Sequence, residues 1–79
     1  MPEPGADASL PRIRELPCTR LTKAVIDVAQ HLVRYEYDDR RGRACSGLLR
    51  LEADDIRLLN RGGSVVLRDQ SGGEIAIRV

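Results

Sequence analysis

The sequence predicts an α+β fold, with an N-terminal helix packed on a four-stranded antiparallel sheet whose two hairpins are joined by a short helix. Apolar residues recur at helical spacing over residues 19–32. Four short runs of alternating apolar and polar residues follow between residues 33 and 79, separated by breaks rich in Gly, Arg and Asp. Because an isolated two-stranded hairpin is marginal in water, the helix is the expected cover of the sheet.

The first 17 residues precede the predicted helix. Residues 1–11 hold three prolines, small residues and two acids, so we expect a disordered tail before a single domain over residues 12–79. In residues 12–17, Ile13 and Leu16 could anchor the chain, and Pro17 keeps Leu16 out of the helical region. This segment fits a short edge strand or an extended strap.

The helix over residues 19–32 rests on one apolar stripe. Its members lie at positions i, i+3, i+4, i+7, i+8 and i+11, and they are Leu21, Ala24, Val25, Val28, Ala29 and Leu32. Thr19 is the candidate N-cap. The β-branched side chains of Val25, Ile26 and Val28 lower helix propensity, but the stripe outweighs them in this interpretation.

Two hairpins and a short helix complete the predicted fold. The first hairpin pairs a strand that starts at Val33 with one that ends at Leu51, around the break at residues 38–43. The second runs from residue 64 to Val79 around residues 70–73. Between them, Asp54 and Asp55 suit a helix start, and Asn60, Gly62 and Gly63 suit its end.

The apolar residues on the outer sheet face leave an alternative open. Strict alternation places Leu48, Val66 and Ala76 among the outward charges. They could mark an interface, or the sheet could curl toward a small SH3-like or Sm-like barrel that partly covers both faces. The barrel rests on analogy between folds alone.

Composition excludes several classes of protein. The net charge of +1 gives no global field for nucleic acid or anionic membrane, and no apolar run approaches the roughly 18 residues of a membrane helix. The N-terminus lacks the apolar stretch of a secretory signal. Cys18 and Cys45, far apart and without a partner histidine at ligand spacing, are typical of reduced cytoplasmic thiols. No catalytic, cofactor or metal motif is present, so we expect neither an enzyme nor a cofactor.

The candidate binding residues are mostly arginines. Arg40, Arg41 and Arg43 form the densest basic cluster, on the tip of the first hairpin beside Asp38 and Asp39. Alternation turns four further arginines outward, where they could recognise carboxylate or phosphate, and these are Arg34, Arg50, Arg68 and Arg78. Twelve Arg against one Lys is explained more cheaply by a GC-rich coding sequence. Tyr35 and Tyr37 lie at i and i+2, as core-edge residues or as a small stacking platform.

The leading functional hypothesis is a small cytoplasmic interaction or regulatory module that binds a protein partner or a second copy of itself as a homodimer. The alternative is a nucleic-acid-binding module that uses the arginine-rich tip and the outward arginines. A third hypothesis is a thiol sensor at Cys18, which precedes the predicted helix. Membrane association is not expected.

Overall fold

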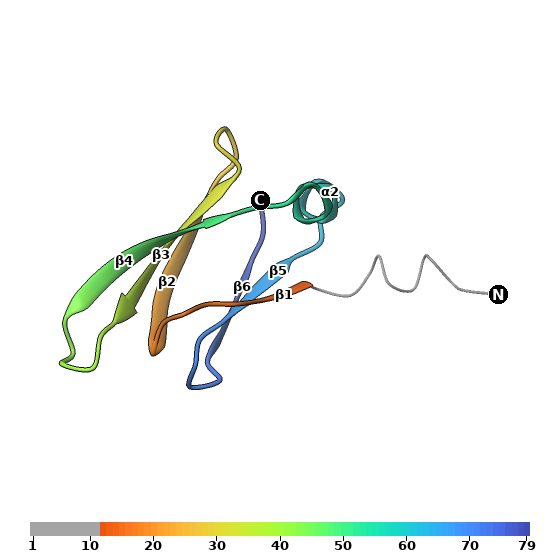
Figure 1. Ribbon diagram of the computed structural model, residues 1–79. Coiled ribbons are helices and arrows are strands. Elements are labelled where there is room, and N and C mark those ends of the chain that lie inside the picture. The colour runs from red at the N-terminus through yellow and green to blue at the C-terminus, as the bar shows by residue number, and fades with distance from the viewer. Residues whose placement is uncertain (1–11) are drawn as a thin grey trace.

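The computed structural model describes residues 12–79, so the expected disordered tail at residues 1–11 lies outside the described residues. The elements are β1 Arg12–Glu15, β2 Arg20–Asp27, β3 Leu32–Asp38, β4 Ala44–Arg50, α2 Ala53–Asn60, β5 Val65–Arg68 and β6 Glu74–Ile77. The strands form two three-stranded sheets, in the orders β1-β5-β6 and β2-β3-β4 (Figure 1).

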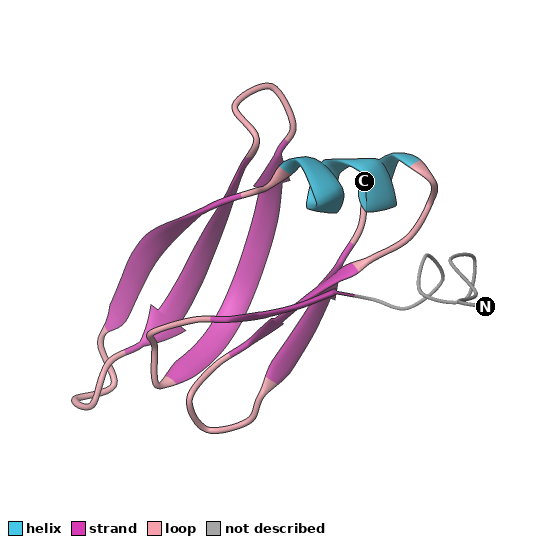
Figure 2. Ribbon diagram, turned by 45° about the vertical axis from the view of Figure 1, so that its right-hand side comes forward, coloured by secondary structure: helices cyan, strands magenta, loops and turns pink. Residues whose placement is uncertain are grey.

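The two sheets enclose one core, with α2 across one end of the molecule (Figure 2). β2, β3 and β4 form an antiparallel meander, whereas β5 is parallel to β1 and antiparallel to β6. Both sheets, α2 and the segments next to β1, β2 and β4 contribute the buried apolar side chains, which are Leu16, Cys18, Leu21, Val33, Tyr35, Leu51, Leu59, Val65, Leu67 and Ile77. Since neither sheet can bury its apolar face alone, the core depends on how the sheets are joined.

Tyr35 fills the part of this core that β4 leaves open. It pairs across the strands with Gly47, and a β-carbon at Gly47 would lie in the space that the Tyr35 ring occupies. A glycine inside a strand often marks such a close approach, and here it leaves room for the Tyr35 ring beside the neighbouring strand. The ring is 7% exposed.

Both hairpins that the sequence predicts are present, as β3–β4 and β5–β6. Their alternation directs Val33, Val65 and Ile77 into the core. Gly42 and Gly72 take positive φ angles of 77° and 90° in the two hairpin loops, a conformation that glycine adopts without steric cost. The two hairpins belong to different sheets, however. β2 adds a third strand to the β3–β4 hairpin, and β1 adds a third strand to the β5–β6 hairpin.

The predicted α+β fold, with an N-terminal helix on a four-stranded antiparallel sheet, is therefore wrong. The described chain is mostly β, with six strands in two sheets and a single short helix. That helix, α2, lies between the hairpins, with Asp54 and Asp55 in its first turn and Gly62 just beyond its end.

A β-bulge explains the failed helix prediction for residues 19–32. Leu21 pairs with Tyr37 and Lys23 with Glu36, so one extra residue is inserted into β2 between them. The bulge separates the inward side chains of Leu21 and Ala24 by three positions, as a helix would. The β-branched residues of this segment favour the strand, and residues 28–31 form the turn that leads into β3.

Residues 12–17 supply a strand rather than a loose strap. β1 pairs in parallel with β5 from Arg12↔Val65 to Glu15↔Arg68, and the Leu16 amide then donates to the Arg68 carbonyl at 2.8 Å. β5 is thereby the central strand of its sheet, which explains why Val65, Val66 and Leu67 are all buried in succession.

The strand assignment of residues 20–27 predicts unequal effects for two aspartate substitutions that a helix would make equally damaging. Val28→Asp should change the free energy of unfolding by no more than about 0.5 kcal/mol, because Val28 is 52% exposed in the turn. Leu21→Asp should cost several kcal/mol, because Leu21 is 8% exposed in the core. Urea denaturation of both variants checks this. A large loss at both positions would instead favour the helix, because the predicted apolar stripe contains both residues.

Candidate binding face

The outer face of the β2-β3-β4 sheet carries exposed apolar and basic side chains in rows across the strands. Arg34 on β3 pairs with Val25 on β2 and Leu48 on β4, and all three side chains are exposed. The adjacent row is Lys23, Glu36 and Ser46. A hollow of about 640 Å³ opens on this face, and its lining includes Arg34, Glu36, Ser46 and Leu48. We call the two rows together the binding face.

The sheet that carries this face also holds the excess positive charge of the described chain. Residues 20–50 contain seven basic and four acidic residues, whereas residues 12–19 and 51–79 together contain six of each. Within residues 12–79, no carboxylate forms an ion pair with Arg34, Lys23 or Arg50. Their charges therefore remain available to a ligand on the outer side of this sheet.

The tip of the β3–β4 hairpin presents two more free arginines. The Asp39 carboxylate accepts hydrogen bonds from the backbone amides of Arg41 and Arg43, both at 2.8 Å, and the Asp39 amide donates to the Arg43 carbonyl. This aspartate turn fixes the loop. The side chains of Arg40 and Arg41 are exposed, and no ion pair within the described part of the chain involves them.

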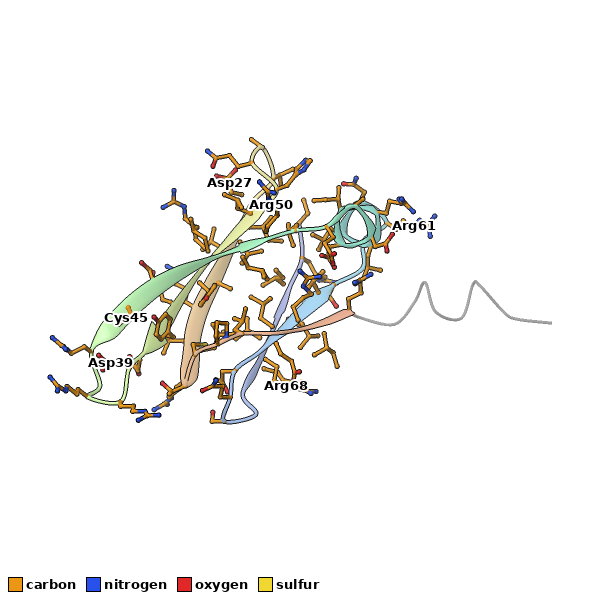
Figure 3. All side chains as sticks on the ribbon, in the orientation of Figure 1. Asp27, Asp39, Cys45, Arg50, Arg61 and Arg68 are labelled. Carbon is orange, nitrogen blue, oxygen red and sulfur yellow. The ribbon has the colours of Figure 1, made fainter. Side chains whose placement is uncertain are left out.

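The remaining predicted arginines are divided between the two sheets. Arg43 pairs with Asp39 at 3.4 Å. Arg68 lies on the other sheet, paired with Glu74 at 2.6 Å, and Figure 3 places it well away from Asp39 and Cys45 at the hairpin tip. Arg50 lies at the opposite end of β4 from that tip (Figure 3), and Arg78 follows β6. The structure thus separates the predicted set into a β3–β4 group and two outlying residues.

The two tyrosines are not placed to stack on a ligand. Both point to the inner side of the sheet, where their ring centroids are 5.9 Å apart. Tyr35 belongs to the core and Tyr37 packs half-buried against it. Burial raises the pKa of the Tyr35 hydroxyl, with smaller contributions from Cys18 and Tyr37. Of the two interpretations open from the sequence, the structure supports core-edge packing.

Sequence reasoning missed Lys23 and Val25 as members of the binding face. The helix prediction assigned Val25 to a buried stripe, whereas its side chain is 52% exposed on β2. The β-branched run from Val25 was the available signal for a strand, but the face on which each residue lies depends on the bulge between Leu21 and Lys23.

Asp69 joins the two sheets at the end opposite α2. Its Oδ2 accepts a hydrogen bond from the Leu21 amide at 2.6 Å, at the bulge of β2. Its Oδ1 accepts from the amides of Ser71 and Gly73 and from the Ser71 hydroxyl. These bonds, led by the one from Leu21, lower the pKa of Asp69 from 3.8 to about 2, and the side chain is 5% exposed.

Arg12 and Arg14 attach β1 to α2. Asp55 is fully buried, with Arg12 Nε 3.0 Å from its Oδ1 and the Glu52 amide donating to its Oδ2 at 2.9 Å. Arg14 also pairs with Glu52, and Arg12 with Asp54 at 3.3 Å. Because these arginines are engaged with carboxylates of the same chain, the β1 side of the molecule offers little free positive charge.

Two further potentially reactive side chains are Cys18 and His31. Cys18 is 3% exposed, and burial followed by the Asp69 charge raises its thiol pKa, which is opposite to what a reactive thiolate requires. His31 is an exposed turn residue with a φ angle of 55°. Residues 12–79 contain no group of three or more His, Cys, Asp or Glu side chains suited to a metal ion. Across the same residues, no helix is long and apolar enough to span a membrane.

No protein-family model matches this chain, and neither a curated protein nor a solved structure is significantly similar to it. The chemistry of the binding face must therefore be judged from its own residues. It offers guanidinium and ammonium groups for carboxylates or phosphates, flanked by two aliphatic side chains.

Two matched substitutions separate the sheet-joining bond of Asp69 from its local turn. Asn at either loop aspartate keeps an oxygen for the turn amides, but Asp69→Asn sets an amide NH₂ against the buried Leu21 N–H. We expect Asp69→Asn to cost about 1–3 kcal/mol of unfolding free energy. Asp39→Asn should cost clearly less, because Asp39 holds only its own loop. Equal losses in urea denaturation would contradict a special role for Asp69.

The lowered pKa of Asp69 also predicts an acid-sensitive stability. The folded-state pKa of about 2 lies below the ordinary value of 3.8, so folding favours the charged carboxylate. The stabilisation is complete above about pH 4 and is lost as the pH falls toward about 2. Thermal unfolding between pH 2 and 6 should show this slope in the wild type and a smaller one in Asp69→Asn. Identical slopes would remove Asp69 from the acid response.

Proposed function

We propose that this chain is a non-catalytic binding module that recognises an acidic protein segment through the binding face on β2, β3 and β4. The observation that carries the proposal is the row of Val25, Arg34 and Leu48. It sets Arg34, which forms no ion pair within residues 12–79, between two exposed aliphatic side chains. A ligand that alternates carboxylates with apolar side chains matches that row, since arginine forks bind carboxylates and the aliphatic groups supply apolar contact.

A protein ligand is favoured over nucleic acid by two features of the same face. Glu36 lies in the row next to Arg34 and interrupts the track of positive charge that a phosphate backbone would follow. Both tyrosines point to the inner side, so no aromatic ring is offered to unstacked bases. The basic tip at Arg40 and Arg41 supports nucleic acid as the second candidate.

The proposal places the protein in the cytoplasm as an interaction or regulatory module. Cys18 and Cys45 are both free thiols, which suits a reducing compartment. Binding, rather than turnover, is the proposed activity because the cations of the binding face suit carboxylate recognition, and none of its residues is a histidine or a cysteine.

A peptide titration tests the proposal. A fluorescent synthetic peptide that alternates Glu and Leu should bind the wild type. The double variant Arg34→Glu/Leu48→Asp should lose at least about tenfold in affinity, since both contacts are removed and one charge is reversed. Fluorescence anisotropy measures both affinities. The matched control is Arg61→Glu/Val79→Asp, which makes the same changes at exposed positions outside the face.

The two candidate functions give different outcomes. Tight binding of a single-stranded oligonucleotide, with an affinity that falls steeply with salt, would favour the nucleic-acid module, because phosphate contacts release counterions. A peptide affinity that falls equally in the face variant and in the control would refute the binding face as the site.

A further inference from the structure

β4 is the unprotected edge strand of the described fold. It has seven residues, its register with β3 is uninterrupted, and it contains neither Lys nor Pro. The other edges are treated differently: β2 carries a bulge and lies beside β6, while β1 and β6 have four residues each. Natural sheets blunt long edges with charges, prolines, bulges or short strands, so an open edge of this length is a site for strand pairing.

The backbone groups that face outward from β4 can be identified. The Asp39 amide donates to the Arg43 carbonyl at one end of the hairpin, and the Leu51 amide to the His31 carbonyl at the other. Hydrogen-bonded and non-bonded pairs alternate along an antiparallel ladder. The N–H and C=O groups of alternate residues therefore point away from β3, and these residues are Ala44, Ser46, Leu48 and Arg50. The Arg50 carbonyl accepts a hydrogen bond from the Arg14 side chain at 3.4 Å, so the open part of the edge runs from Ala44 to Leu48.

Charges at the two ends of β4 are complementary. The exposed Arg40 and Arg41 lie beyond the start of the strand. Glu52 and Asp54 lie beyond its end, where they pair with Arg14 and Arg12, and their side chains remain 59% and 63% exposed. When two β4 strands pair antiparallel about their middle, the basic tip of each copy lies alongside the acidic start of α2 in the other. A second copy of this chain thus matches the edge in both backbone and charge.

We propose that two copies of this chain associate through antiparallel pairing of their β4 edges, forming one continuous six-stranded sheet. The contact is isologous and closes as a two-fold dimer. It stands independently of the proposed function, because it uses the strand edge and not the sheet face. A strand-edge contact is small, so the association is expected to depend on concentration within an accessible range.

Light scattering across a concentration series tests this proposal. The wild-type mass should rise from 8.8 kDa toward twice that value. Ser46→Pro removes one outward N–H and should keep the chain monomeric, because that group makes no bond to β3. Ala76→Pro is the control: it removes an N–H on the β6 edge that faces β2 and should leave association unchanged.

If Ser46→Pro disturbs folding, a charge variant tests dimerisation instead. Arg40→Glu/Arg41→Glu should weaken dimerisation by about tenfold or more by setting like charges together. Arg20→Glu/Arg78→Glu carries the same charge change away from β4 and should dimerise like the wild type. A wild type that stays monomeric throughout overturns the proposal and leaves the edge to a strand of another protein. A dimer that survives both β4 variants, or that is lost only in Ala76→Pro, overturns it as well.

Discussion

The arrangement of the two sheets depends on one buried carboxylate. The Asp69 carboxylate accepts hydrogen bonds from Ser71 and Gly73 in its own hairpin loop. It also accepts a hydrogen bond from the Leu21 amide, which belongs to the other sheet. The Gln70 amide adds a bond to the Cys18 carbonyl at 2.8 Å beside it. An amide left without a partner at a bulge would cost free energy, so the carboxylate satisfies the irregular backbone and joins the sheets with the same atoms.

The two hairpin loops contain the same aspartate turn, but the turn has a different role in each. Asp39 and Asp69 each accept amides two and four residues ahead, and a glycine with positive φ follows three residues after each. Asp69 is buried and holds a neighbouring sheet. Asp39 holds only its own loop, whose neighbours Arg40 and Arg41 are exposed. The turn chemistry is set by sequence, but its consequence depends on what packs against it.

Ion pairs within the chain divide the arginines into those that are neutralised and those that remain available to a ligand. The carboxylates near β1 and α2 hold Arg12 and Arg14. The arginines of β3 and of the hairpin tip have no such partners in the described part of the chain, apart from Arg43. The charge of residues 12–79 is therefore divided between a neutral part, residues 12–19 and 51–79, and a basic part, residues 20–50. Local charge, more than the total, indicates where an acidic ligand or a second copy would bind.

The sequence alone determined the two hairpins, because period-two alternation and glycine-containing turns are local signals. It also determined α2, through the paired acids at its start and the glycines beyond its end. Tertiary structure decided the rest. The bulge in β2 mimics helical spacing, and the Leu21 amide that it presents is bonded by Asp69, 48 residues away. The parallel pairing of β1 with β5 likewise joins segments distant in sequence. Such contacts fix which face each residue of β2 occupies, and hence the binding face, and no local pattern encodes them.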